Sequence, residues 1–434
     1  MEKSLCLYFQ VHQPDRLRLY RFFDIGNDSQ YFDEFANRTI LKRIAQRCYL
    51  PMNELIYELI QKHGKNFKVA FSISGAALEQ FEQYAPEVLE SFKKLASTKC
   101  VEFLAETYSH SLASLKSEKE FKNQVKEHSA AIKKHFGVKP KTFRNTELIY
   151  SDTIGEAVAA MGFNTMLTEG AKHILGWKSP HYLYHCNMAP KLKVLLRDYK
   201  LSDDISLRFS NPAWEEYPLM CDTYMDWIKD MPEEDGIYNI FMELCALGIY
   251  QPLSSNILDF IKAMPECAKQ RGITFSTPSE IIKSHDSVAP LDVPYPMSWN
   301  DEERDISCWL GNVMQREAFE KLYSIGERVR LTGDKHLLQD WDYLQASNNF
   351  RFMTTKNNNV SMDRGIYESP YDAFTNYMNI LGDFMARVRW ALPQDMEIEE
   401  LNAFQTTIRN QDKKIQSLEK QVARLKSANS KKKK

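Results

Sequence analysis

Seven short apolar runs of strand length, alternating with segments of helical spacing, constrain the fold of this 434-residue chain more than any other feature. Strands that alternate with helices favour a parallel sheet with right-handed crossovers. Seven such runs within the first 289 residues predict an α/β fold, an incomplete (β/α)7 barrel, rather than an open sheet. An eighth apolar run, residues 273–275, is short.

Each of the seven runs ends near a polar residue. These residues are His12, Ser74, Glu106, Glu147, Glu169, Asp198 and Glu243. The carboxyl ends of barrel strands lie at one rim, and charges gathered there are costly unless they bind a polar ligand or perform catalysis. Any one of these residues could cap a helix, but together they predict a functional mouth.

The stretch 142–150, Thr-Phe-Arg-Asn-Thr-Glu-Leu-Ile-Tyr, lies in the middle of this series. It begins as a short strand and turns polar at Arg144 and Asn145, which can hold the carboxylate of Glu147 in its charged form. Its place just past a strand end makes Glu147 a candidate catalytic residue. The alternative is a structural role in the first turn of the next helix, where the helix dipole favours negative charge.

The composition of the chain indicates which kinds of partner it can bind. The chain is 43% hydrophobic and 12% aromatic, which predicts a globular protein, and its formal net charge is −2. A nucleic-acid-binding domain would show a basic surplus, so we expect neutral or mixed partners and no nucleic acid. Aromatic side chains suit a sugar ligand, although most of them belong to a core.

The sequence also predicts where the protein resides and which groups it lacks. No basic segment precedes a long apolar run at the N-terminus, and no stretch reaches membrane-spanning length, so we expect a soluble cytoplasmic protein without a membrane partner. The eight cysteines form no Cys-x-x-Cys pair, and no glycine-rich phosphate loop is present, so no cofactor is expected. His181 and His185 have the spacing of a helical metal pair, but Pro180 precedes them, and we expect no metal there.

The sequence pattern changes after residue 289, which predicts a domain boundary there. Prolines at 290, 294 and 296 precede a region of helical spacing from 301 to about 390. We therefore predict a catalytic-type barrel at 1–289 and a helical subdomain at 290–392 that completes the cleft.

The last segment has a heptad pattern. One heptad position holds Leu401, Ile408, Ile415 and Val422, and the other holds Phe404, Gln411, Leu418 and Leu425. β-branched residues at the first position and leucines at the second favour a parallel two-stranded coiled coil, predicted at 396–428 with a homodimer through residues 398–425. The alternative is a lone amphipathic helix docked on the body. Residues 429–434 are predicted to be a basic disordered tail.

Three motifs occur in order along the chain. They are His-Gln-Pro at 12–14, Phe-Arg-Asn-Thr-Glu at 143–147, and Glu-Glu-Arg-Asp at 302–305, which is flanked by tryptophans and followed by Trp-Leu-Gly-Asn at 309–312. This set resembles the motifs of glycoside hydrolase family 57, in particular its α-amylase branch, over about residues 1 to 385. The resemblance implies a seven-stranded β/α barrel, a helical C-terminal region and retaining action on α-glucosidic bonds.

The resemblance also implies roles for single residues. Retaining hydrolysis uses two carboxyl groups about 5 Å apart, one to attack the anomeric carbon and one to protonate the leaving oxygen. Glu147 matches the family's nucleophile. The implied substrate contacts are His12, Glu106, His110 and Asp305, with Trp309 placed to stack on a sugar of an α-glucan or maltooligosaccharide.

The fourth motif departs from the branch pattern. The α-amylase branch has Phe-Met-Asp-Tyr-Glu-Thr-Phe-Gly-Glu-His here, with the aspartate as general acid and base, whereas residues 241–250 are Phe-Met-Glu-Leu-Cys-Ala-Leu-Gly-Ile-Tyr. Glu243 is thus the candidate acid and base, and Cys245 stands where the branch has a glutamate. One extra methylene moves a carboxyl group by about 1 Å, which can cost about a hundredfold in rate. Asp198 and the pair 203–204 are alternatives, although capping and solvation are the favoured roles for them.

Three functions remain open at this point. The first is an α-glucan hydrolase or transglycosylase of the α-amylase type whose activity is impaired by the changed motif. The second is a non-catalytic α-glucan-binding or regulatory protein, dimerised by its coiled coil. The third is a scaffold whose coiled coil recruits a partner.

Overall fold

The computed structural model describes residues 3–356 and 365–392, together with residues 406, 407, 410, 411, 414, 415 and 418. The predicted coiled coil at 396–428 and the tail at 429–434 therefore lie outside the described residues, apart from these seven positions. No helix in the described part of the chain is both long and apolar enough to cross a bilayer.

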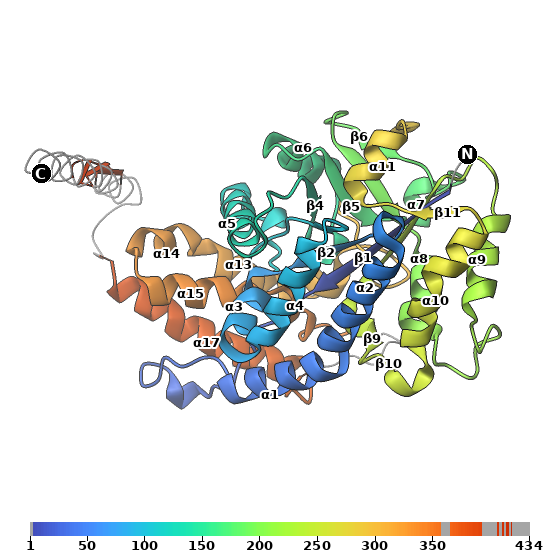
Figure 1. The fold of residues 1–434 in the computed structure, drawn as a ribbon. Coiled ribbons are helices and arrows are strands. Elements are labelled where there is room, and N and C mark those ends of the chain that lie inside the picture. Colours follow the sequence, from blue (N-terminus) through green and yellow to red (C-terminus); the bar gives the residue numbers. More distant parts are fainter. Residues whose placement is uncertain are drawn as a thin grey trace, which may run out of the picture.

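Seven parallel strands form a ring. Figure 1 shows strands in the interior of the molecule and helices around them. In their order around the ring they are β1 (Lys3–Val11), β2 (Val69–Ile73), β3 (Val101–Phe103), β4 (Thr142–Arg144), β5 (Thr165–Glu169), β7 (Lys193–Arg197) and β8 (Ile237–Glu243). A parallel bridge between Ala105 and Phe143 joins β3 to β4. The ring closes where Asp198 N donates to Asn239 O at 2.9 Å and where β8 pairs with β1 over Ser4–Gln10. The predicted fold class, a seven-stranded α/β barrel with a helical C-terminal region, is confirmed.

The eighth apolar run does not form an additional strand of the seven-stranded barrel. β11 (Ile273–Phe275) pairs with the first residues of β1, Lys3–Leu5, whereas β2 pairs with the last ones, Tyr8–Val11. Both strands share one edge of β1, because β1 is long and each partner covers only part of it. Four short strands were not predicted from the sequence. They are β6 (Tyr184–Cys186), β9 (Leu247–Gly248), β10 (Gln251–Pro252) and β12 (Ala289–Leu291).

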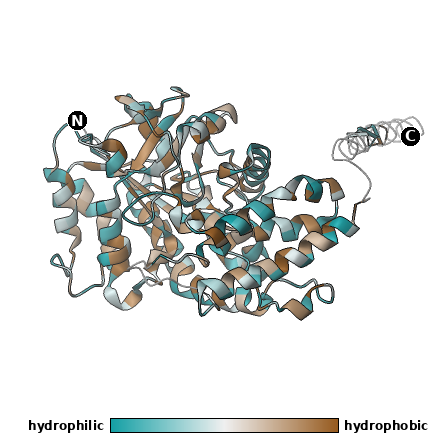
Figure 2. Cartoon of the chain, turned by 180° about the vertical axis from the view of Figure 1, so that it is seen from behind, coloured by the Kyte–Doolittle hydropathy of each residue, from teal (hydrophilic) through white to brown (hydrophobic). Residues whose placement is uncertain are grey.

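Amphipathic helices cover the outside of the barrel. They include α1 (Glu34–Ile44), α2 (Leu50–His63), α3 (Gly75–Tyr84), α4 (Pro86–Ser97), α5 (Glu118–Phe136), α6 (Asp152–Ala160), α10 (Ile257–Gln270) and α11 (Pro278–Ser284). Figure 2 shows hydrophilic and hydrophobic residues alternating along these helices, as expected when one face packs on a sheet. In α5, Ser117 caps the start of the helix and Gly137, in a left-handed conformation, ends it.

The region after the barrel is helical. It consists of α12 (Ser307–Leu310), α13 (Val313–Ser324), α14 (Gly326–Thr332), α15 (Lys335–Leu344), α16 (Ser347–Arg351) and α17 (Pro370–Trp390). These helices share one hydrophobic core with barrel residues such as Phe143 and Ile149. Bridges from Ser111 to Ala346 and from Tyr150 to Met297 fix this region over the carboxyl ends of the strands. Residues from the last third of the chain therefore reach the mouth of the barrel.

Candidate active site

Glu147 lies on a tight turn directly after β4, not in a helix that packs on the barrel. Its φ of 55° and ψ of 27° are left-handed, and α6 begins only at Asp152 with Ser151 as its cap. Glu147 is the acidic residue of a short 3-10 segment, η5 (Thr146–Leu148), and lies outside the first turn of α6. The turn aims the side chain into the barrel mouth, where it is 6% exposed.

Left-handed backbone conformations concentrate around this carboxylate. Of the seven non-glycine residues with positive φ in the described chain, five are His110, Glu147, Leu148, Asp301 and Arg304. Each such conformation costs on the order of 1 kcal/mol or more and persists only where the surroundings enforce it. All five lie after strand ends or in the segment that covers the mouth, so the mouth is where the fold stores strain.

Three donors surround the carboxylate of Glu147. The indole N–H of Trp299 donates to Oε2 at 2.8 Å, and the hydroxyl of Ser347 donates to Oε1 at 2.9 Å. Nε2 of His110 lies 3.4 Å from Oε1. Oε1 thus has two partners and Oε2 has one, which leaves a lone pair of Oε2 open to a ligand.

Charged side chains behind His110 hold its ring in place. Its Nδ1 lies 3.2 Å from Oε2 of Glu106, and Arg144 Nη1 lies 3.6 Å from the same oxygen. Arg144 also donates to Oε1 of Gln10 at 2.6 Å. The other oxygen of Glu106 is buried and accepts no hydrogen bond from the described residues.

His12 completes this wall of the site. Its ring stacks on that of His110 with centroids 4.1 Å apart. Nε2 donates to Oδ1 of Asn348 at 3.0 Å, and Nδ1 accepts from the hydroxyl of Ser74 at 2.8 Å. Burial and the neighbouring His110 charge lower the pKa of His12 well below its usual value, which agrees with a neutral ring bonded in this way.

The ionisation of Glu147 and His110 is coupled. Burial alone would raise the pKa of Glu147, but the His110 hydrogen bond and the charges of His110, Arg351 and Arg144 hold that pKa well below the usual carboxyl range. Burial would lower the pKa of His110, yet Glu106 and Glu147 raise it. The two groups therefore favour each other's charged forms, a carboxylate and an imidazolium.

Glu243 lies on the same rim. It ends β8 and is the ladder partner of Gln10, the residue that Arg144 contacts. The carboxylate is half-buried and accepts a hydrogen bond from Tyr250 at 3.0 Å. Arg351, which lies 5.7 Å over the ring of Trp299, has its pKa raised by the charges of both Glu147 and Glu243, although burial opposes this. The guanidinium of Arg351 thus interacts electrostatically with both candidate carboxylates.

The loop after Glu243 keeps its shape without the second carboxylate of the branch pattern. Cys245 lies half-buried with its sulfur 3.4 Å from the hydroxyl of Tyr49. Gly248 has a φ of 120°, and a Cβ there would lie 2.3 Å from the carbonyl oxygen of Arg47, so only glycine fits. Gln251 accepts from Ser210 N and donates to a backbone carbonyl. The residues that this motif retains are those that fix the loop.

Two predicted contacts lie apart from the carboxylates. Asp305 accepts from the backbone N–H of Ser307 at 2.8 Å at the start of α12. Trp309 is 0% exposed and belongs to the hydrophobic core, so neither ring face is open to a sugar in this structure. The structure brings together Glu147, Glu106, His110 and His12, with Glu243 on the same rim, and leaves Asp305 and Trp309 outside this cluster.

The other titratable candidates are used structurally. Asp198 caps α8 (Tyr199–Asp203) through Leu201 N and also contacts His181 at 2.7 Å. Arg197 contacts Asp203 and Glu169. His185 lies in β6 and contacts Ser287, so the histidine pair shares neither a helix nor a partner. Within the described ranges, no group of three or more His, Cys, Asp and Glu side chains could hold a metal ion.

Sequence reasoning missed several residues of this site. Ser347, Asn348 and Arg351 come from α16, a five-residue helix inside a region predicted only as helical. Gln10 offered a signal, because it is a polar residue within an otherwise apolar strand run. Trp299 was singled out only as a member of a tryptophan-rich segment.

Comparison with known proteins agrees with this geometry. Residues 6–294 match the model of glycosyl hydrolase family 57. The chain belongs to this family. A protein of Methanocaldococcus jannaschii named "Putative alpha-amylase" is 39% identical over 396 residues, which cover 87% of this chain and 83% of that protein.

Several solved structures share the fold. A family 57 branching enzyme from Thermococcus kodakaraensis has a TM-score of 0.66 at 13% identity, and the match covers 93% of this chain and 94% of the enzyme. An α-amylase from Thermotoga maritima has a TM-score of 0.61 at 12% identity, with 92% and 96% covered. A 4-α-glucanotransferase from Thermococcus litoralis has a TM-score of 0.59 at 13% identity, and the match covers 81% of this chain but only 56% of that longer chain. At these identities the likeness shows the fold.

Proposed function

We propose that this family 57 protein cleaves or transfers α-glucosidic bonds of α-glucans by a retaining mechanism, with Glu147 as the nucleophile and Glu243 as the general acid and base. The observation that carries the proposal is the position of Glu147 at the barrel mouth, where Trp299, Ser347 and His110 surround its carboxylate. The names of the similar proteins, an amylase, a branching enzyme and a glucanotransferase, support an α-glucan as the substrate.

The reaction has two steps. Oε2 of Glu147, the oxygen with one partner, attacks the anomeric carbon while the glycosidic C–O bond breaks and Glu243 gives its proton to the leaving oxygen. In the second step water or a sugar hydroxyl gives its proton to Glu243 and attacks the same carbon, which releases Glu147. We assign His12, Glu106 and His110 to substrate contact, and Glu106 supports this with its unpartnered buried oxygen.

A second candidate is an α-glucan-binding or regulatory protein without turnover. It is supported by the fourth motif, in which Glu243 and Cys245 replace two carboxylates of the branch pattern. The homodimer through residues 398–425 fits either candidate and rests on the heptad pattern alone.

Two substrates separate the roles of the carboxylates. Maltoheptaose has a leaving group that must be protonated, whereas α-maltosyl fluoride does not need a proton donor. We expect Glu147→Gln to abolish turnover of both substrates. Glu243→Gln should lower the rate on maltoheptaose by about 10²- to 10⁴-fold but spare the first release of fluoride, because only the second step of the fluoride reaction needs Glu243 as a base. Glu234→Gln, an exposed carboxylate before β8, is the matched control. Binding of maltoheptaose without turnover of either substrate by the native chain would favour the second candidate.

A further inference from the structure

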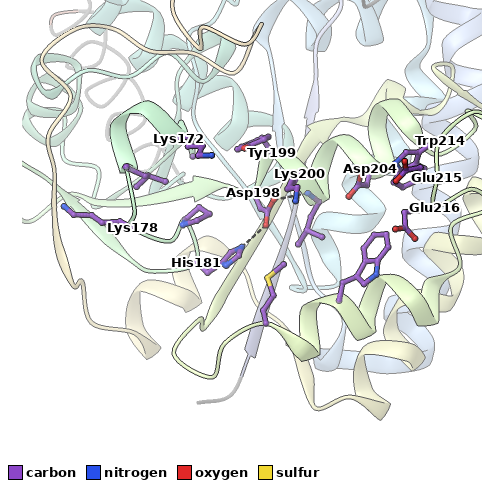
Figure 3. Close-up of a pocket in the computed structure, with 17 residues that line it drawn as sticks. Lys172, Lys178, His181, Asp198, Tyr199, Lys200, Asp204, Trp214, Glu215 and Glu216 are labelled. Atoms are coloured by element: carbon purple, nitrogen blue, oxygen red, sulfur yellow. Dashed lines mark hydrogen bonds and ion pairs between the residues drawn. The ribbon is translucent and has the colours of Figure 1, made fainter.

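A pocket of about 680 Å³ lies beside the barrel mouth, outside the cluster around Glu147 (Figure 3). It is bounded by α7 (Lys172–Leu175), by α8, and by α9 (Cys221–Asp230) with the loop that precedes it. We propose that this pocket is a second, non-catalytic binding site for a segment of an α-glucan chain. The choice of ligand rests on the proposed function, whereas the pocket itself does not.

Two of the seven tryptophans of the chain line this pocket, and a third is adjacent in sequence to lining residues. Trp214 and Trp227 line the pocket, and Trp177 lies between Gly176 and Lys178, which also line it. Trp177 is 92% exposed. Pockets that bind small molecules are typically lined by aromatic side chains with a few polar groups, and indole faces cover the apolar C–H faces of sugar rings. The indole of Trp177 is not itself a lining residue, but its exposure leaves it accessible to a ligand.

The polar groups of the pocket suit a neutral ligand with many hydroxyls. The side chains of Lys172, Lys178, Lys200, Glu215 and Glu216 are exposed and make no hydrogen bond or ion pair with any residue in the described ranges. They offer both donors and acceptors, and a sugar hydroxyl uses both. Figure 3 shows Lys172 and Lys200 near the middle of the pocket and Glu215 and Glu216 together beside Trp214 at the far end. Because cations and anions are both present, a purely anionic ligand is not favoured.

The histidine and aspartate side chains at the floor of the pocket are already paired with one another. His181 is buried between two aspartates, with Nε2 2.7 Å from Asp198 and Nδ1 2.9 Å from Asp235. Asp198 uses its other oxygen to cap α8 at Leu201 N. Both ring nitrogens and both oxygens of Asp198 are therefore occupied, so neither group can exchange a proton with a ligand. The His181–Asp198 pair at the floor is therefore not free to act as an acid and base on a ligand.

One rim connects the pocket to the candidate active site. Tyr199 lines the pocket, and the guanidinium of Arg304 lies 4.8 Å over its ring. Arg304 belongs to the segment that also carries Trp299, the hydrogen-bond donor to Glu147. A long glucan can therefore contact both sites, whereas a short oligosaccharide occupies one.

Single substitutions test this site. We compare Trp177→Ala and Trp214→Ala with Trp390→Ala, a matched control at the end of α17 that is 69% exposed. Trp177→Ala removes an exposed ring and leaves the core intact. Each variant is measured for retardation in soluble-starch affinity gels, and for kcat/KM on amylose and on maltotetraose.

The expected result is a loss specific to long chains. Each pocket substitution weakens starch retention and lowers kcat/KM on amylose by about 3- to 10-fold, as for one aromatic contact, while kcat/KM on maltotetraose and the Trp390→Ala variant stay at native values. Equal behaviour of Trp177→Ala, Trp214→Ala and Trp390→Ala in a chain that turns over amylose overturns the pocket but leaves the proposed function intact. Tryptophan-dependent retention by a chain that turns over nothing overturns the catalytic proposal and leaves the pocket standing.

Discussion

The indole N–H of Trp299 donates to Oε2 of Glu147 across 152 positions of sequence. Trp299 belongs to the segment that follows the barrel strands, and Glu147 ends the turn after β4. The bond ties the proposed nucleophile to the part of the chain that covers it.

Trp299→Phe removes this donor and keeps a ring of similar size. We expect kcat/KM on maltoheptaose to fall by about 10- to 100-fold, because a hydrogen bond to a charged group is worth about 1.5–3 kcal/mol. Trp390→Phe, far from the mouth, is the control and should keep the native value. The two variants should melt within a few degrees of each other, and a Trp299→Phe enzyme as fast as the control would show that this bond does not matter for catalysis.

His110→Gln tests the coupling of charges at the mouth. Loss of the imidazolium removes a charge that lowers the pKa of Glu147, so that pKa rises and more of the carboxyl is protonated in mild acid. We expect the acidic limb of the kcat/KM profile to move to higher pH, and activity at pH 5 to fall more than activity at pH 7. The measurement is a pH profile on α-maltosyl fluoride, which isolates the nucleophile. A limb that stays in place would mean that His110 does not control the ionisation of Glu147.

The buried triad of His181, Asp198 and Asp235 predicts pH-dependent stability. Burial would lower the pKa of His181, but the two aspartates raise it. A raised folded-state pKa gives stability that is full below the unfolded value of about 6.5 and is lost as pH rises through the folded value. His181→Gln leaves two carboxylates without their cation and should cost about 3–5 kcal/mol near pH 6.

The gap in Tm between native protein and His181→Gln should therefore be largest at pH 6 and should narrow in alkali. Differential scanning calorimetry across this range measures it. A gap of constant size would mean that packing of the ring, rather than its charge, stabilises the fold.

Restoring the second carboxylate of the branch pattern should speed the reaction. The double variant Glu243→Asp with Cys245→Glu sets the acid at its usual reach and places a carboxylate near Tyr49, whose hydroxyl lies 3.4 Å from the sulfur it replaces. Burial raises the pKa of Tyr49 well above its usual value, so this hydroxyl remains a donor. We expect turnover of maltoheptaose to rise by up to about 100-fold. Glu243→Asp with Cys245→Gln has the same shape without the charge and should gain less.

The heptad segment predicts a dimer that is separable from catalysis. Removal of residues 393–434 should halve the mass measured by light scattering and leave kcat/KM on maltoheptaose at the native value. A truncated chain of unchanged mass would remove the coiled coil from consideration, and a loss of activity on truncation would favour the scaffold function.

The barrel could be predicted from sequence because its cause is local. Strand runs such as residues 165–169 and the capped helix at 118–136 lie where periodicity places them, and strand ends must share a rim. Most of the carboxylates and histidines followed from that rule. Ser347, Asn348 and Arg351 could not be found in this way, because their role depends on how a five-residue helix packs over the rim. The burial of Trp309 could not be predicted either, because the residues around it in sequence do not indicate whether its ring lies in the core or at the surface.

The contacts of α16 have a consequence for biosynthesis. A ribosome that has completed the barrel strands has made Glu147 and His12 but not Ser347 and Asn348, which bond to them. A nascent chain halted before this helix would hold a charged carboxylate without its covering donors. The order of translation thus delays a competent site until the last fifth of the polypeptide has begun to emerge.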